Sequence, residues 1–249
     1  MAEIGTVGEK TKYINVLACG HSKMGKTVWA STAPNPLWFD FEHGLASLRG
    51  DARKQPVISF EAIQTKKERP VNLQVRDIIR ELRLEKGDTY DFVKEHKIET
   101  LVFDSITGFA DLLSTDTLVQ PFDDTPIKPK ERNGALELQD YNWILNRVWT
   151  MVRDLNALPY NFVALAGIES RQDDAARRKD QPMVVGNKLG DKLGHFFDDV
   201  LTFDYDDKKG KYTISTEPSK YFKFSGSRNG IPPGVYENKG WDTFKEWWS

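Results

Sequence analysis

The sequence predicts an α/β fold: a mostly parallel sheet flanked by helices, with an antiparallel β-meander at its C-terminal end. Up to residue 167, short apolar strands alternate with segments of helical spacing, which is the order of β/α units in a parallel sheet. From residue 200 onward, three short strands follow one another with only turns between them. We expect a single domain over residues 1–249, with an N-terminal tail at 1–12.

Four segments in the first two thirds of the chain have the pattern of buried strands. Their residues are apolar at both odd and even positions, as expected where helices cover both sides of a parallel sheet. The predicted strands are 13–19, 37–41, 100–104 and 161–167.

Helices are predicted between these strands. Pro34 and Pro36 end the first helix, because proline cannot continue a helix, and Gly87 interrupts the second. The predicted helices are 26–32, 71–96 with a break at Gly87, one that begins at Ser105, and 136–158. Residues 119–135 hold three prolines and show no periodicity, so they are expected to form a mobile loop.

The C-terminal part of the chain changes character. Strands are predicted at 200–206, 211–216 and 220–224, joined by Lys-Lys-Gly and Pro-Ser turns. After them, Trp241, Phe244 and Trp248 recur at helical spacing and form one apolar stripe. We therefore predict a helix over 241–249 that docks on the core; the alternative is that its apolar stripe is a surface for a partner.

Composition excludes several classes of protein. The 35 Lys and Arg residues against 37 Asp and Glu give a net charge of −2, which excludes a protein that coats nucleic acid through bulk positive charge. The single cysteine, Cys19, cannot form an internal disulfide, and no Cys/His cluster predicts structural zinc. The longest apolar run, around 162–168, is too short to span a membrane, and the N-terminus lacks a signal peptide. We expect a cytoplasmic protein with no membrane partner.

Residues 20–27 match the phosphate-binding pattern G-x-x-x-x-G-K-[ST] between a predicted strand and a predicted helix. Glycines let backbone N–H groups surround phosphates, and the helix N-terminus adds partial positive charge. The pattern predicts that ATP and Mg²⁺ are the cofactors, with Lys26 at the β- and γ-phosphates and Thr27 as a ligand of the metal. The predicted nucleotide contacts are Gly20, His21, Ser22, Lys23, Met24, Gly25, Lys26 and Thr27.

Two further acidic positions follow predicted strands. Asp104 ends the strand 100–104, where an acid binds Mg²⁺ in such sites; the alternative is that Asp104 or Ser105 caps the next helix. Glu42 follows the strand 37–41, where a carboxylate can deprotonate the attacking water. A solvated strand-end acid or a helix cap is the alternative for Glu42, and Asp40 is the competing base.

With these segments together, the chain resembles the RecA-like branch of P-loop ATPases, and in particular the small phage ATP-binding proteins of recombination and single-strand annealing. WFDFEHGL resembles the family's segment with the catalytic glutamate, which corresponds to Glu42, and LVFDSITGF resembles its Walker B strand, with Asp104 and Ser105. PMVVGNKLGDKLGHFFDDV (182–200) resembles a stretch of the phage group. The resemblance implies an ATP hydrolase of RecA-like fold, located in the host cytoplasm if the chain is phage-encoded.

KFSGSRNG (223–230) is similar to a late motif of hexameric RecA-like helicases that reaches a neighbour's ATP. The resemblance implies that Arg228 acts in trans, with Lys223 a looser match because its spacing differs; the alternative is an ordinary turn arginine. The family's polar γ-phosphate sensor after the strand 161–167 has no clean match, since Glu169 and Gln172 are the nearest substitutes.

The resemblance also implies single-stranded DNA as a partner, contacted by two mobile loops at 119–135 and 169–192. Self-association as a ring or filament and a single-strand-binding protein are further implied partners. The DNA-contact candidates are Arg171, Arg177, Arg178 and Lys179, although mixed charges also fit a solvated loop.

Two alternatives to this function stay open. One is a nucleotide-gated loader that recruits another protein without processing DNA. The other is a small-molecule kinase, which is disfavoured because no second basic acceptor site stands out. Glu42 separates them, since a base for water serves only hydrolysis.

Overall fold

The computed structural model describes residues 13–65, 67–119, 135–172, 178–184, 190 and 192–248. The described strands are β1 (Asn15–Gly20), β2 (Pro36–Asp40), β3 (Val57–Ser59), β4 (Thr100–Asp104), β5 (Asn161–Gln172), β6 (Arg178–Met183), β7 (Asp199–Asp206), β8 (Lys211–Ser215), β9 (Gly226–Ser227) and β10 (Val235–Glu237). The described helices are α1 (Lys26–Ala30), α2 (Val71–Leu84), α3 (Asp88–Glu95), α4 (Ile106–Val119) and α5 (Leu138–Asn156), with short 3₁₀ turns η1 (Leu45–Ser47), η2 (Gly50–Lys54) and η3 (Gly194–Phe196).

The described strands form one sheet in the order β10-β8-β7-β1-β5-β4-β2-β3, with β6 paired to β5 and β9 paired to β7. The strands from β7 to β3 along this order are parallel, whereas β8 and β10 continue the sheet in antiparallel pairing. The predicted fold class is therefore confirmed. Because β1 lies inside the parallel part, its carboxyl end opens at the edge where such sheets bind ligands.

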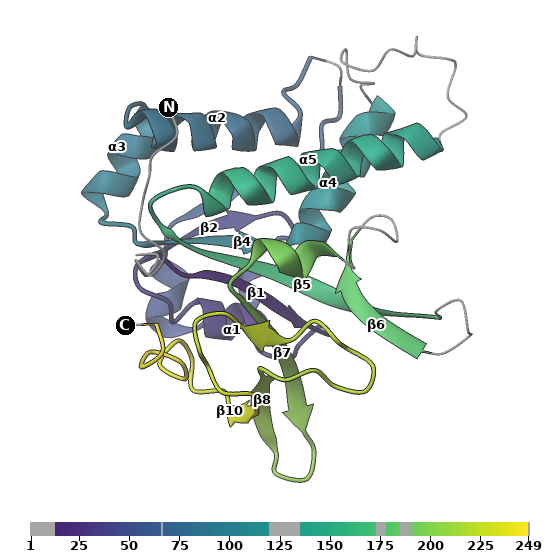
Figure 1. The fold of residues 1–249 in the computed structure, drawn as a ribbon. Helices are drawn as coiled ribbons and strands as arrows, with labels where there is room; N and C mark the ends of the chain where they lie inside the picture. The colour runs from purple at the N-terminus through teal and green to yellow at the C-terminus, as the bar shows by residue number, and fades with distance from the viewer. Residues whose placement is uncertain are drawn as a thin grey trace, which may run out of the picture.

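Figure 1 shows the sheet between two layers, with α2, α4 and α5 over one face and α1 on the other. Alternate residues of each strand separate the two cores: Leu17 and Cys19 of β1 face the α2–α5 layer, whereas Val16 and Ala18 face α1. Cys19 is fully buried, and burial raises the pKa of its thiol to about 12, so it packs as a small apolar residue.

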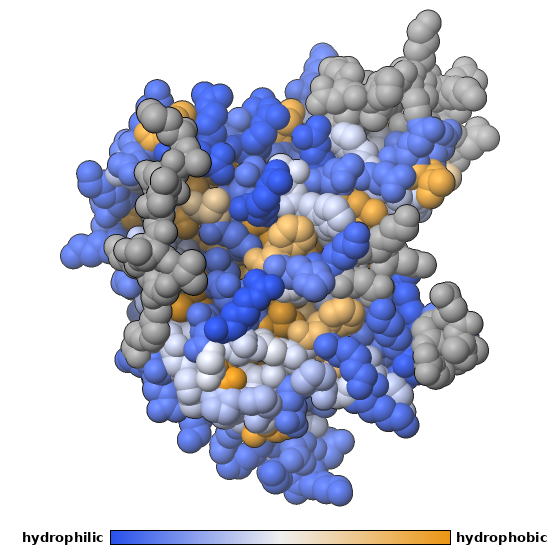
Figure 2. Space-filling view, in the orientation of Figure 1, coloured by the Kyte–Doolittle hydropathy of each residue, from blue (hydrophilic) through white to orange (hydrophobic). Residues whose placement is uncertain are grey.

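The face in Figure 2 is mostly hydrophilic, with apolar side chains gathered in its middle, over α5 and η3. Trp149 and Phe196 are partly buried, with ring centroids 6.0 Å apart. The Lys192 ammonium lies 5.6 Å from the Trp149 ring centroid, where the negative face of the ring attracts a cation. Among the described helices, none has the length and apolar character to cross a membrane.

The predicted mobile loop at 169–192 is wrong at residues 169–172 and 178–183. There β5 continues to Gln172 and pairs with β6 as an antiparallel hairpin. Polar cross-strand contacts stabilise it: the Ser170 hydroxyl donates to Asp180 at 2.7 Å, and the Gln181 amide donates to Glu169 at 2.9 Å. The sequence pattern missed this hairpin because it has no alternation of apolar and polar residues. The other predicted loop, 119–135, lies almost wholly outside the described residues.

Two predicted C-terminal elements are also wrong. Residues 220–224 form no strand; only Phe222 makes an isolated bridge, and β10 takes the third place in the meander. Residues 241–248 form turns rather than a helix, although Trp241 and Phe244 are buried as expected. The edge strand β3 was not predicted, because its three residues are largely exposed and carry no period.

Aromatic packing explains the spacing of the C-terminal apolar residues. Trp29 of α1 lies 5.6 Å from Trp241 and 6.2 Å from Trp248, measured between ring centroids. The Trp248 indole donates to the buried Asp199 at 2.6 Å, and the Trp241 N–H donates to the Thr32 hydroxyl at 2.6 Å. The C-terminal segment is thereby attached to α1, directly behind the phosphate-binding pattern.

Candidate active site

The predicted phosphate-binding segment, residues 20–27, begins at the end of β1, continues as a tight loop over 21–25 and ends in the first turn of α1. Gly25 has φ of +85°, a conformation that glycine adopts without steric cost. The Lys26 ammonium reaches back across the loop and donates to the carbonyls of Gly20 at 2.8 Å and His21 at 2.9 Å. Burial lowers the pKa of this ammonium, while the negative charge of Asp104 opposes the shift. The loop therefore holds a cation at its centre, which suits polyphosphate.

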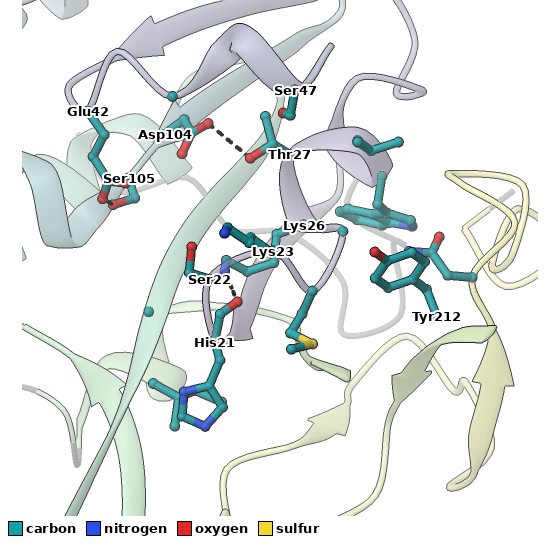
Figure 3. Close-up of a pocket in the computed structure, with 18 of the residues that line it drawn as sticks. His21, Ser22, Lys23, Lys26, Thr27, Glu42, Ser47, Asp104, Ser105 and Tyr212 are labelled. Carbon is teal, nitrogen blue, oxygen red and sulfur yellow. Dashed lines mark hydrogen bonds between the residues drawn. The ribbon is translucent and has the colours of Figure 1, made fainter. Parts of the chain in front are cut away.

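A cavity of about 880 Å³ opens around this loop, and every residue from His21 to Thr27 lines it. Gly20 does not line it and contributes only its carbonyl, so that predicted contact is indirect. Glu42 and Asp104 line the same cavity, although they are distant from the loop in sequence. Figure 3 shows both acids on one side of the loop, with a hydrogen bond between Asp104 and Thr27.

Thr27 and Asp104 are brought together by β4, the strand that carries Asp104 at its carboxyl end. The Thr27 hydroxyl donates to the Asp104 carboxylate at 3.3 Å. Burial, followed by the charges of Glu42 and Asp40, raises the pKa of Asp104 to about 7. A divalent cation would remove this repulsion, and hydroxyl and carboxylate oxygens are the ligands that Mg²⁺ prefers. The two residues therefore fit the predicted metal.

In the described part of the chain, no group of three or more His, Cys, Asp or Glu side chains could hold a metal ion. A Mg²⁺ ion bound with a nucleotide uses only one or two protein ligands beside phosphates and water. The pair Thr27 and Asp104 agrees with that ligand set.

Glu42 is positioned by two residues at the start of α4. The Ser105 hydroxyl donates to the Glu42 carboxylate, and it accepts from the Gly108 N–H at 3.0 Å. Ser105 therefore caps α4, which is the alternative role considered for Asp104 or Ser105 above. The same hydroxyl also holds the Glu42 carboxylate in place. A Cβ atom at Gly108 would lie 2.5 Å from Glu42 Cγ, so only glycine leaves room for the Glu42 side chain.

Asp40 has a different environment from Glu42. It is buried, does not line the cavity, and accepts from the Glu42 N–H at 3.3 Å. Its carboxylate shapes the turn that presents Glu42. Of the two candidate bases, only Glu42 lies where water could reach it and the phosphates.

A family model described as "AAA domain" matches residues 12–228, which is most of the chain and includes the loop, Glu42 and Asp104. The chain belongs to this AAA domain family. It is thus an AAA-type P-loop ATPase domain. The matched span ends before the C-terminal segment that packs on α1.

Two solved structures are similar to this AAA domain chain in fold. The KaiC-like protein PH0186 from the hyperthermophilic archaeon Pyrococcus horikoshii OT3 is 12% identical, with a TM-score of 0.41 over 90% of this chain and 84% of that one. A prototypical ATPase from the type III secretion system of pathogenic bacteria is 14% identical, with a TM-score of 0.41 over 86% and 56% of the two chains. No curated protein matches the chain.

Thr107 of this AAA domain chain links the cavity to the β5–β6 hairpin, and sequence patterns gave no signal for it. Its hydroxyl donates to the Met183 carbonyl at 2.6 Å and accepts from the Gly167 N–H at 3.2 Å. Thr107, Gly167 and Met183 all line the cavity. Glu169, one of the two nearest substitutes for a sensor, lies further along the hairpin, where it pairs with Arg171. The Thr107 hydroxyl of α4 therefore lies beside Gly167, at the end of the predicted strand 161–167 where a polar sensor was expected.

Three of the four predicted DNA-contact residues lie on the described strands of this hairpin, and each of the three contacts another described side chain. Arg171 pairs with Glu169 at 2.7 Å, and Arg178 pairs with Asp180 at 2.8 Å and stacks over Tyr221, 4.6 Å from its ring centroid. Lys179 lies 5.7 Å from the ring centroid of Phe224. Arg177 lies outside the described residues.

Arg228 follows β9 on the surface, away from the cavity of its own chain. Its backbone N–H donates to the Asp198 carbonyl at 2.8 Å, and its guanidinium donates to the His195 carbonyl at 3.4 Å. Because it does not line this cavity, an action on the γ-phosphate is open to it only through a second copy of the chain.

Proposed function

We propose that this chain is a Mg²⁺-dependent ATP hydrolase in which Glu42 is the general base. The observation that carries the proposal is a single cavity lined by the phosphate loop, by the metal-fitting pair Thr27 and Asp104, and by Glu42. A kinase has no need of a base for water at this position, whereas hydrolysis requires one.

The chain's own residues divide the reaction between them. The backbone N–H groups of the loop and the Lys26 ammonium bind the β- and γ-phosphate oxygens. Glu42 orients a water molecule toward the γ-phosphorus and accepts its proton, and the Ser105 hydroxyl fixes the orientation of the Glu42 carboxylate. Thr27 and Asp104 would hold Mg²⁺, which when bound neutralises charge that develops on the phosphate oxygens.

Replacing Lys26 with alanine tests nucleotide binding. We expect MgATP affinity to fall by about 30-fold or more and hydrolysis to become undetectable, because the variant loses the central cation of the loop. Isothermal titration calorimetry and a phosphate-release assay measure the two effects. Lys209→Ala is the control, since Lys209 is an exposed lysine that does not line the cavity. Retained hydrolysis in the Lys26 variant would overturn the assignment.

We further propose that single-stranded DNA is the effector of this ATPase and acts through the β5–β6 hairpin. Two points support this: the resemblance to the phage recombination ATPases, and the Thr107 contacts that join the hairpin to the end of the Walker B strand. Since Arg171 and Arg178 are already paired with acids, DNA must compete for them, so binding is expected to be weak and sensitive to salt.

The test measures ATP hydrolysis with and without a single-stranded oligonucleotide in wild type, Thr107→Val and Arg178→Ala. We expect stimulation in wild type, a stimulated-to-basal ratio near one in Thr107→Val with DNA still bound, and weakened DNA binding in Arg178→Ala. Valine keeps the shape of threonine but removes the hydroxyl that bonds to the Gly167 N–H and the Met183 carbonyl. If the oligonucleotide did not change the rate of ATP hydrolysis in wild type, the result would instead favour a nucleotide-gated loader.

A further inference from the structure

The cavity around the phosphate loop extends well beyond the part that hydrolysis uses. Glu42 and Asp104 line one end, where the γ-phosphate lies in the proposed mechanism. Figure 3 shows Tyr212 on the opposite side of the loop from these acids. Val28 and Asn238 also line the cavity. A nucleotide whose γ-phosphate points at Glu42 must place its nucleoside toward this second end.

Tyr212 of β8 offers an aromatic surface there. Tyr212 is 46% exposed as a residue, and its ring lines the cavity. Tyr205 holds the ring in a T-shaped pair with centroids 5.1 Å apart. On the loop side, a Cβ atom at Gly25 would lie 3.6 Å from the Tyr212 ring, so the ring borders the phosphate loop directly. Val28, a residue that is 51% exposed, adds an apolar surface near the start of α1.

Asn238 offers a hydrogen-bond donor beside this ring. The backbone N–H of Asn238 donates to the Tyr212 carbonyl at 3.0 Å, and the side-chain Oδ1 accepts from the Gly240 N–H at 3.1 Å. Its Nδ2 would lie 3.4 Å from a Cβ at Gly25, and it has no hydrogen-bond partner within the described residues. The side chain is thus oriented by its oxygen while its NH₂ group stays free to donate.

The segment that carries Asn238 is held rigidly against α1. Gly240 has φ of +77°, and a Cβ atom there would lie 2.6 Å from the Thr32 hydroxyl, so a larger residue cannot replace it without a shift. The next residue, Trp241, donates its N–H to that hydroxyl. Residues 238–240 lie beyond the span 12–228 that the AAA domain model matches.

From this arrangement we propose that Tyr212 and Asn238 form a nucleobase site that favours purines. The base stacks on the Tyr212 ring, and the Asn238 NH₂ group donates to a ring nitrogen. A purine covers more of the ring than a pyrimidine does, so stacking selects for it. The inference rests on the proposed ATP binding and assigns the base end of that same cavity.

The test compares MgATP with inorganic tripolyphosphate, which carries the phosphates without a nucleoside, by isothermal titration calorimetry. We expect Tyr212→Ala to weaken MgATP binding about tenfold and Asn238→Ala to weaken it about fivefold, because stacking and one hydrogen bond are lost. Tyr212→Phe keeps the ring and should bind as wild type does. Tripolyphosphate affinity should not change in any of the three variants.

A second readout is the ratio of ATP to CTP affinity, which should fall toward one in Tyr212→Ala. Unchanged MgATP affinity in Tyr212→Ala, or an equal loss of tripolyphosphate affinity, would overturn the nucleobase site. Lys26→Ala distinguishes the nucleobase site from the proposed phosphate site, since this variant should lower the affinity for both MgATP and tripolyphosphate. Wild-type protein that binds neither ligand would overturn the nucleobase site together with the proposed ATPase.

Discussion

Replacing Glu42 with glutamine should lower the rate of ATP hydrolysis by about 100-fold or more while MgATP affinity changes by less than about threefold. Removal of a general base costs about two to four orders of magnitude in rate. Glutamine keeps the size of the side chain and can still accept from the Ser105 hydroxyl, so the fold of the site is preserved. A single-turnover phosphate-release assay together with calorimetry separates the chemical step from binding.

Asp111 provides a matched control, because its carboxylate lines the same cavity from α4. Asp111→Asn should slow hydrolysis by no more than a few-fold. If Asp111→Asn abolished hydrolysis and Glu42→Gln retained it, the base would be assigned to the wrong acid. Gly108→Ala should resemble Glu42→Gln in hydrolysis, since a methyl group at 108 displaces the Glu42 side chain.

Replacing Asp104 with asparagine should have opposite effects on activity and stability. Hydrolysis should fall by about 100-fold or more, because the proposed metal loses its charged ligand. The pKa of Asp104 is raised from 3.8 to about 7, so between these values the folded protein holds a proton that the unfolded chain releases. Ionisation of Asp104 therefore costs no stability below about pH 4, destabilises the folded state increasingly as pH rises from 4 to 7, and has a constant cost above pH 7.

Asparagine cannot ionise, so the Asp104→Asn variant keeps the stability that wild type loses when Asp104 ionises. In buffer without Mg²⁺ or nucleotide, we expect the free energy of unfolding of Asp104→Asn to exceed that of wild type by about 2 kcal/mol at pH 8, with a small difference at pH 4. Denaturant unfolding at the two pH values measures the difference. A variant that is less stable than wild type at pH 8 would contradict the raised pKa, and added Mg²⁺ should stabilise wild type alone.

The parallel core could be predicted from sequence because its signals are local. Strand β4 was predicted at its observed residues, 100–104, since a strand covered on both faces is apolar throughout. The break between α2 and α3 falls at Gly87, as predicted, where φ is +107°. The hairpin of β5 and β6 escaped prediction, because cross-strand pairs of polar side chains stabilise it and leave no periodic pattern.

The C-terminal segment misled prediction for a different reason. Trp241, Phe244 and Trp248 have helical spacing, but packing on Trp29 fixes their positions in a series of turns. A hydrophobic period does not distinguish a helix from turns that follow a curved apolar surface.

The phosphate end of the site was predictable, whereas its supporting residues were not. Lys26, Thr27 and Asp104 belong to motifs with fixed local context, and the structure brings them together at one cavity. Gly108, Thr107 and Tyr212 act through close approach or through contacts between segments that are distant in sequence. Only a three-dimensional arrangement reveals such roles, because nothing in the spacing of these residues differs from an ordinary helix or strand.

A crystal structure with Mg²⁺, ADP and beryllium fluoride as a γ-phosphate mimic tests the assignment of the cavity's two ends most directly. We expect the beryllium fluoride group at the Lys26 ammonium, Mg²⁺ at Thr27 and Asp104, and a water molecule between the mimic and the Glu42 carboxylate. The adenine should stack on Tyr212. A nucleotide bound in the opposite direction, or a Glu42 carboxylate turned away from the γ-phosphate mimic, would contradict the proposed site.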